Sequence, residues 1–252
     1  MKRARFGTAL MILCLGLPLL AAAQGLELSG PLTGSRSFPE GAAEPDARFV
    51  FSYAYPQFAP TDSAAESVNA YYQAVAQDME SVDLEAMAGE MPEEGMPAAY
   101  TQLDHQVTHN DGRYLSVVLT ARHFAGNGES ESVSANTFAR DGVYAGQMLS
   151  LTQVLGLENE DQPNEEQSVA AKLAYGLVWD IASAGMENVD GDYLDGLTEE
   201  TLEAAFSPET DFYLDEDGNV VFFVQAGVLA GEVAGVLTFP FAPAEILSAL
   251  GA

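Results

Sequence analysis

The sequence predicts an α+β fold, with a mostly antiparallel sheet and several packed helices. Runs of residues that alternate between apolar and polar are separated by tight turns at 110–112 and 215–218. Turns of this kind join antiparallel strands. Apolar residues also recur at helical spacing, for example over 63–79 and 164–184. Because strands and helices neither alternate strictly nor segregate at the ends of the chain, we expect hairpins to dominate the sheet.

The folded part is expected to begin with a strand and a helix. Residues 49–55 alternate aromatic and smaller side chains and end before Pro56, as in a strand. Ser63 then caps a helix, with Glu66 three residues further on, as in a capping box. The apolar face of this helix consists of Val68, Tyr72, Val75 and Met79. We expect that face to lie in the core, and the acidic, Met-rich stretch 83–98 to form an irregular insertion.

Strands are expected to dominate the middle of the chain. Three are predicted at 100–109, 114–125 and 132–138, joined by an Asp-Gly turn and by a glycine-containing bend. A short strand at 147–151 then leads into a helical turn. We expect the other elements to pack around this group of strands.

The remainder is expected to be helical first and then stranded. Asn164 caps a long helix that ends at Ala184, with Trp179 in the core or at its edge. Val169, Leu173, Leu177 and Ile181 lie on one apolar face of that helix, which is flanked by Ala170, Ala174 and Val178. The later elements are a helix at 198–206, strands at 212–214, 220–225 and 233–239, and a closing helix that begins at Pro243.

The first 23 residues have the features of a secretory signal peptide. Three basic residues precede an apolar stretch at 9–20, and three alanines end at Ala23. The apolar stretch is short for a membrane span, and no other uninterrupted apolar stretch approaches one. We therefore expect cleavage near Ala23 and a soluble periplasmic or secreted chain. The single cysteine, Cys14, lies inside the signal, so the mature chain has neither disulfides nor thiol chemistry.

The mature chain is strongly acidic. Residues 1–23 hold three basic and no acidic side chains, so their removal leaves six Lys and Arg against 38 Asp and Glu, a formal net charge of −32. Such a field excludes nucleic acid and anionic lipid surfaces as simple partners, and it attracts basic proteins and cations. The alternative is a solvated acidic surface adapted to salt. Residues 24–48 are rich in Gly, Pro, Ser and Ala without a period, and are expected to form a flexible leader.

Residue patterns for catalysis or metal binding are weak. His105 and His109 lie four residues apart on a predicted strand, which separates them by about 13 Å. They therefore cannot share a zinc ion, whose ligands lie about 2 Å from the metal. The acidic turns at 190–195 and 215–219 lack the spacing of a calcium-binding EF-hand and are interpreted as structural turns. No nucleophile elbow or phosphate loop is present. We predict no catalytic residue, no metal site and no cofactor.

Several segments carry a family resemblance. Tyr55-Pro56 at a strand end, and Asn69 in the following helix, match the first of two adjoining modules. RYLSVVLTA from Arg113, ANTFARDGVYAGQMLSLTQVLG from Ala135 and FYLDEDGNVVFFVQAGVLAGEVAGVLTFPF from Phe212 match the second, in order. Through these segments, the chain resembles the extracellular part of RsiV-like, lysozyme-sensing anti-sigma factors. It also resembles the N-terminal part of PdaC-like peptidoglycan deacetylases. The resemblance implies an RsiV-like α+β domain over 49–252, with modules at 49–99 and 100–252.

One loop departs from this family. Family members often have Gly-Gly-Ala-His after the strand that RYLSVVLTA matches, whereas residues 125–132 read AGNGESES and lack the histidine. The resemblance is to the sensor or accessory modules, without a deacetylase domain or a membrane helix. Because loops often carry function, the first candidate binding site is this loop with its neighbour. Its residues are His123, Gly126, Asn127, Gly128 and Glu129.

The leading functional hypothesis is an exported, non-catalytic binding domain. The resemblance and the charge suggest two ligands, a basic protein such as a lysozyme or a cell-wall glycan. A competing hypothesis is an enzyme that acts on cell-wall polymer through carboxylates in a groove. A third is a structural acidic envelope protein in a salt-rich habitat.

Overall fold

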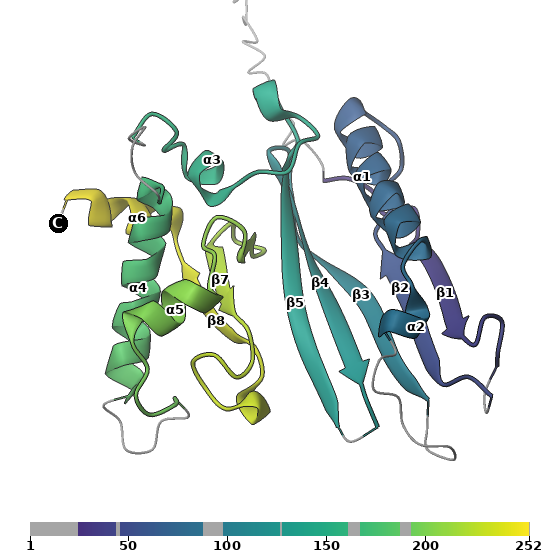
Figure 1. The fold of residues 1–252 in the computed structure, drawn as a ribbon. Coiled ribbons are helices and arrows are strands. Elements are labelled where there is room, and N and C mark those ends of the chain that lie inside the picture. Colours follow the sequence, from purple (N-terminus) through teal and green to yellow (C-terminus); the bar gives the residue numbers. More distant parts are fainter. Residues whose placement is uncertain are drawn as a thin grey trace, which may run out of the picture.

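The computed structural model describes residues 25–43, 46–87, 98–126, 128–160, 167–186 and 193–251. The expected signal peptide lies outside these ranges. The described chain forms a five-stranded and a three-stranded sheet, each accompanied by helices (Figure 1). The prediction of an α+β fold with mostly antiparallel strands is confirmed. No helix within the described ranges is long and apolar enough to cross a membrane.

The larger sheet has the strand order β1-β2-β3-β4-β5. Its strands are β1 (Leu32–Phe38), β2 (Phe49–Tyr55), β3 (Ala99–Asn110), β4 (Tyr114–Phe124) and β5 (Glu129–Ala139). Only the pairing between β2 and β3 is parallel, because the helix α1 connects these two strands by a crossover. The predicted β3–β4 and β4–β5 hairpins and the predicted bounds of β2 are confirmed.

The prediction that residues 24–48 form a flexible leader is wrong for β1. This strand pairs antiparallel with β2 from Leu32 to Phe38. Its sequence, LTGSRSF, has few apolar residues, so the alternation that identifies half-buried strands is weak. Two kinds of tertiary contact stabilise it instead. The guanidinium of Arg36 donates to the carbonyl oxygens of Met79 and Val82, and Gly34 leaves room for the ring of Tyr53.

Helix α1 (Ser63–Glu80) packs on one face of the larger sheet (Figure 1). Its cap is Asp62 rather than the predicted Ser63, since a carboxylate oxygen of Asp62 accepts from the backbone N–H of Ala65 at 2.8 Å. The predicted apolar face is confirmed, with Val68 and Tyr72 fully buried. A short helix, α2 (Leu84–Met87), follows, and residues 88–97 of the expected insertion lie outside the described residues.

The smaller sheet has the order β6-β7-β8 and a core of its own. Its elements are α3 (Leu151–Leu155), α4 (Val169–Met186), α5 (Glu199–Ala205), β6 (Phe212–Leu214), β7 (Val220–Val224), β8 (Leu237–Phe241) and α6 (Pro243–Ser248). Single 3-10 turns lie at Gly142–Tyr144, Glu232–Ala234 and Ala249–Gly251. The predicted β6–β7 hairpin, the helix at 198–206 and the helix start at Pro243 are confirmed.

Three predictions in this half need correction. The expected strand at 147–151 is a single bridge between Phe138 and Met148. The last strand begins at Leu237 rather than at Val233, whose side chain is fully exposed in a 3-10 turn. The described part of α4 begins at Val169, where Ser168 accepts from the N–H of Ala171, and Asn164 lies outside the described residues.

The core-facing side of α4 is also displaced from the prediction. The fully buried positions carry small residues: Ala170, Ala174, Val178 and Ala182. Ile181, which was placed on the apolar face, is 43% exposed. The predicted face was centred on the largest apolar side chains, whereas the small residues that flank it face the core that α4 shares with β6, β7 and β8. The bulkier Val169, Leu173 and Leu177 lie at the margin of the core.

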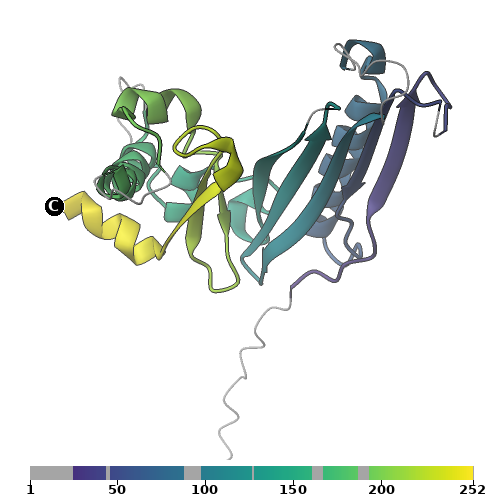
Figure 2. The ribbon, with the colours of Figure 1, turned by 90° about the horizontal axis from the view of Figure 1, so that it is seen from below.

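The two cores divide the chain near residue 140. One core draws on residues from Leu26 to Phe138 and the other on residues from Leu151 to Ile246. Figure 2 shows the two lobes side by side. The predicted module boundary at 99–100 lies at the start of β3, which pairs with β2.

Candidate functional site

The predicted loop site lies at the end of the β4–β5 hairpin. Gly126 has a φ of 91°, which favours glycine there, and Gly128 is exposed. His123 contacts the hydroxyl of Thr101 through Nδ1 at 3.0 Å. Glu129 accepts from the hydroxyl of Tyr100 at 2.6 Å, and this hydrogen bond raises the pKa of Tyr100. These side chains therefore join the end of the hairpin to the neighbouring strand β3. Asn127 lies outside the described residues.

The three histidines lie at separate places and each has its own partner. Nδ1 of His105 donates to the carbonyl oxygen of Ala54 at 2.8 Å. Nδ1 of His109 donates to the carbonyl oxygen of Asp215 at 2.7 Å. Within the described ranges, no three His, Cys, Asp or Glu side chains gather closely enough to hold a metal ion.

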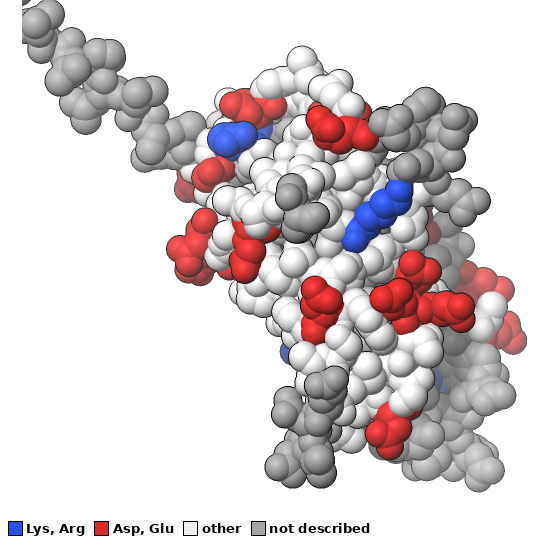
Figure 3. Space-filling model, turned by 90° about the vertical axis from the view of Figure 1, so that its left-hand side faces the viewer, with Lys and Arg blue, Asp and Glu red and all other residues white. Residues whose placement is uncertain are grey.

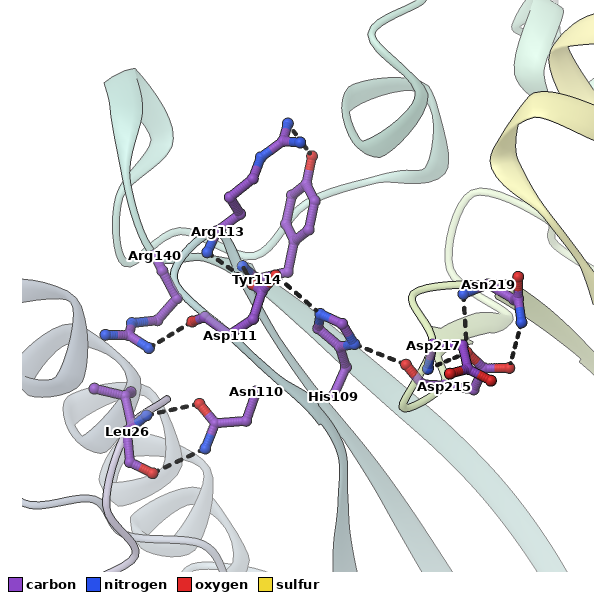
Figure 4. Close-up of polar contacts among 10 residues, drawn as sticks. All are labelled: Leu26, His109, Asn110, Asp111, Arg113, Tyr114, Arg140, Asp215, Asp217 and Asn219. Carbon is purple, nitrogen blue, oxygen red and sulfur yellow. Dashed lines mark hydrogen bonds and ion pairs between the residues drawn. The ribbon is translucent and has the colours of Figure 1, made fainter. Parts of the chain in front are cut away.

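The acidic turn at 215–219 is closed by its own hydrogen bonds (Figure 4). The carboxylate of Asp215 accepts from the backbone N–H groups of Asp217 and Asn219, and from the side-chain amide of Asn219. These hydrogen bonds make Asp215 the residue that closes the turn. Residues 187–192 of the other acidic turn lie outside the described residues.

A polar junction joins this turn to the larger sheet (Figure 4). Besides its contact with Asp215, His109 places Nε2 3.5 Å from the carboxylate of Asp111. Partial burial opposes ionisation of Asp111, but backbone N–H groups and the neighbouring His109 together lower its pKa. Arg140 donates to the carbonyl oxygen of Asp111 and pairs with Asp62, which caps α1. The junction thus connects α1, the β3–β4 turn and the second lobe.

A cavity of about 320 Å³ lies at the seam between the lobes. Its lining residues come from β5, from the start of α3 and from residues 209–212. Glu209 is the charged group in this lining, and it accepts from the hydroxyls of Thr152 and Ser168 and from the N–H of Thr152. Burial acts to raise the pKa of Glu209, but these hydrogen bonds outweigh it, so the pKa lies below its ordinary value. Glu209 therefore anchors the first turn of α3 and the start of α4.

A second cavity, of about 240 Å³, lies between α4 and α5. We call it the α4–α5 groove. Its lining residues are Gln167, Lys172, Tyr175, Gly176, Trp179, Glu199, Leu202 and Glu203. On α4 the lining positions are spaced i, i+3, i+4 and i+7, and on α5 they are spaced i, i+3 and i+4, so each helix presents one stripe to the groove.

The aromatic wall of the groove is fixed in place by packing. The hydroxyl of Tyr175 donates to the carbonyl oxygen of Phe206 at 2.6 Å, and its ring meets the ring of Phe206 edge-on at 5.6 Å. Burial, and then the charges of Glu203 and Asp211, raise the pKa of Tyr175. Trp179 is half-buried against the core. The expectation that Trp179 lies at the edge of the core is confirmed.

The comparisons with solved structures reveal the fold type. The chain superposes on a DUF3298 family protein from Pseudomonas aeruginosa PAO1 with a TM-score of 0.53, at 14% identity over 88% of this chain and 93% of that one. A DUF3298 family member from Bacteroides fragilis NCTC 9343 gives a TM-score of 0.50 at 15% identity, over 90% of this chain and 99% of that one. The fold resembles that of DUF3298 proteins. Neither a protein-family model nor a curated protein sequence matches the chain.

The DUF3298 similarity supports the predicted resemblance at the level of the fold. DUF3298 is the domain associated with RsiV-like and PdaC-like proteins, so the chain has the architecture that the sequence motifs implied. At 14% and 15% identity, the similarity indicates a shared fold and assigns neither a ligand nor an activity to this chain.

Sequence reasoning missed the α4–α5 groove. One signal was present: Gly176 lies in the interior of the predicted helix, where glycine is unfavourable. The facing stripe on α5 could not be assigned without the tertiary structure, because residues 172–179 and 199–203 are brought together only by folding.

Proposed function

We propose that this chain is an exported, non-catalytic binding domain of the sensor type, and that its main ligand is a basic protein such as a lysozyme. The observation that carries the proposal is the excess of acid, with 38 Asp and Glu against nine Lys and Arg in the whole chain. The expected signal peptide supports export, and the DUF3298-like fold is consistent with the RsiV-like resemblance.

The structure accounts for why so much negative charge remains available to a partner. Arg36 and Arg140 are committed to backbone carbonyl oxygens and a helix cap within the lobes. On the face that Figure 3 shows, acidic side chains form separate groups among wide areas of uncharged residues. Dispersed, exposed carboxylates of this kind raise the association rate of a cationic protein, and they do so more strongly at low salt.

Calorimetric titration with lysozyme at low and at moderate salt tests this proposal. We expect heat of binding at low salt and weaker binding at moderate salt, because screening shortens the range of the attraction. An acidic protein of similar size serves as the control and gives no heat. A folded sample that releases no heat with lysozyme at either salt concentration contradicts a basic-protein ligand.

A cell-wall glycan is the second candidate ligand. It is favoured by the α4–α5 groove, where Trp179 and Tyr175 lie beside hydrogen-bonding side chains. Incubation with peptidoglycan, followed by chromatography of the soluble products, separates binding from the competing enzymatic hypothesis. Polymer that is retained by the protein but chemically unchanged supports a binding role.

A further inference from the structure

We propose that the α4–α5 groove is a binding subsite for one uncharged sugar ring of a glycan. This inference rests on the proposed function, since it gives the binding domain a glycan-contacting site. Four features of the groove support it: its size, its aromatic wall, the balance of its polar groups and the open space above Gly176.

The size of the groove fits one ring. Its volume of about 240 Å³ is below the roughly 300 Å³ at which pockets for drug-sized ligands begin. The groove lies between two helices, and several of its lining residues are exposed, so it is reached from the surface. A polymer that presents one residue at a time is the type of ligand that this shape accepts.

The aromatic wall suits the apolar face of a sugar ring. Trp179 and Tyr175 lie one helical turn apart on α4, and Leu202 adds an aliphatic contact from α5. Packing on the core and the hydrogen bond to Phe206 hold the tyrosine ring before any ligand arrives. A preorganised aromatic surface of this kind reduces the entropy lost on binding.

The polar lining contains both donors and acceptors. Glu199 and Glu203 only accept hydrogen bonds, Lys172 only donates them, and Gln167 does both. A sugar hydroxyl is both a donor and an acceptor, so it can donate to the carboxylates and exchange hydrogen bonds with Gln167. An anionic ligand would meet the two carboxylates of Glu199 and Glu203. A hydroxyl-rich ring without negative charge therefore suits this lining, and the titration with a lysine-rich peptide tests a cationic ligand.

Gly176 keeps the groove open. A Cβ atom built on it would have no neighbouring atom within 4 Å, so the glycine is not required by close packing. Its φ also lies outside the left-handed range that favours glycine. Within a helix, glycine is less stable than alanine. A glycine here is explained by a ligand that passes over it, between the rings and the carboxylates.

Trp179 makes the test direct, because it is the only tryptophan of the chain and its fluorescence reports on the groove alone. The purified protein is titrated with chitotriose as a neutral glycan, with a short lysine-rich peptide and with glucuronic acid. We expect a saturable fluorescence change with chitotriose only. A change with the peptide and not with chitotriose, or with none of the three, overturns the proposal.

Variants separate the groove from general surface effects. Gly176→Leu fills the groove from a position with open space above it, and we expect the affinity for chitotriose to fall at least about tenfold. Glu203→Gln should weaken binding, whereas the matched Glu200→Gln, whose exposed side chain lies outside the lining, should not. Circular dichroism and thermal melting check that each variant is folded. Unchanged affinity in a folded Gly176→Leu protein overturns the proposal.

The lysozyme titration keeps this inference separate from the proposed function. Heat with lysozyme, together with no response to chitotriose, removes the sugar subsite and leaves the basic-protein ligand. A response to chitotriose that Gly176→Leu abolishes, together with no heat from lysozyme, keeps the subsite and makes the glycan the ligand of the domain.

Discussion

Nδ1 of His109 donates to the carbonyl oxygen of Asp215 at 2.7 Å, across a separation of 106 residues in the chain. This contact joins the end of β3 to the turn between β6 and β7. It is one of several polar links between the lobes, since Gln225 on the second lobe also exchanges two hydrogen bonds with the backbone of Val133 on β5. The two cores are therefore coupled by specific hydrogen bonds.

Replacing His109 with alanine should weaken this coupling. We expect His109→Ala to lower the free energy of unfolding by about 1–2 kcal/mol, because a largely buried hydrogen bond is lost and a carbonyl oxygen loses one of its partners. Urea denaturation followed by circular dichroism measures the change. His123→Ala is the matched control, because His123 lies at the hairpin end and its partners are hydroxyls that water can replace. Equal losses in the two variants would argue against a special role for the junction.

Ser116 provides a second test of the coupling. Its hydroxyl is fully buried, contacts the hydroxyl of Thr137 at 2.9 Å and accepts from the backbone N–H of Leu214 at 3.0 Å. Ser116→Ala leaves that N–H without its partner, so we expect a loss of about 1–3 kcal/mol in the free energy of unfolding. Hydrogen exchange of the Leu214 amide should accelerate in the variant. An unchanged exchange rate at that amide would contradict the assigned contact.

The sequence predicted local structure better than it predicted which faces pack together. β2 and the hairpins were identified correctly because alternation and Asp-Gly turns act over a few residues. β1 was missed because its stability depends on pairing with β2 and on hydrogen bonds from Arg36. Those hydrogen bonds reach carbonyl oxygens more than 40 residues away in the chain. The centre of the buried face of α4 was misplaced. Small residues such as Ala174 are fully buried there, whereas the bulkier Ile181 is 43% exposed.

The candidate site shows the same limit. The loop around Gly126 was chosen from local composition. The side chains of His123 and Glu129 hydrogen-bond to residues of β3. The α4–α5 groove needs Trp179 and Glu203 to approach from helices with another segment between them, and no local pattern encodes that approach. Trp179 was correctly expected at the edge of the core, but its place in the lining of the groove could not be predicted from the helix alone.

Protonation of Glu209 at low pH should destabilise the second lobe. Its folded pKa lies below the ordinary value of 4.5, so its stabilising contribution is complete above that pH and is lost as the pH falls through the folded pKa. We expect Glu209→Gln to lower the free energy of unfolding at pH 7 by about 1–3 kcal/mol, because an amide NH₂ would face the donors of Thr152 and Ser168. The difference between the two proteins should shrink in acid. A difference that stays constant down to the acid transition would show that Glu209 does not act through its charge.

Asp211 should behave in the opposite way. Burial raises its pKa above the ordinary value of 3.8, and the hydrogen bond from the N–H of Ser207 offsets only part of this effect. Its ionised form is therefore disfavoured by folding, and stability is lost as the pH rises through the folded pKa. We expect Asp211→Asn to stabilise the protein at neutral pH, since the amide oxygen can still accept from Ser207. Thermal melts at pH 7 and pH 3 check this: the gain should be present at pH 7 and absent at pH 3.

Gly176 links stability to the proposed sugar subsite. Gly176→Ala adds a methyl group to a site with open space around it, and alanine is the better helix former, so the free energy of unfolding should rise by about 0.5–1 kcal/mol. The same methyl group enters the groove beside Trp179, so the affinity for chitotriose should fall while stability rises. Urea denaturation and the fluorescence titration measure the two effects on one protein. If stability rises while the affinity for chitotriose falls, α4 retains a destabilising glycine because binding in the groove requires it. A variant that is stabilised but binds chitotriose as before would show that the glycine serves no ligand.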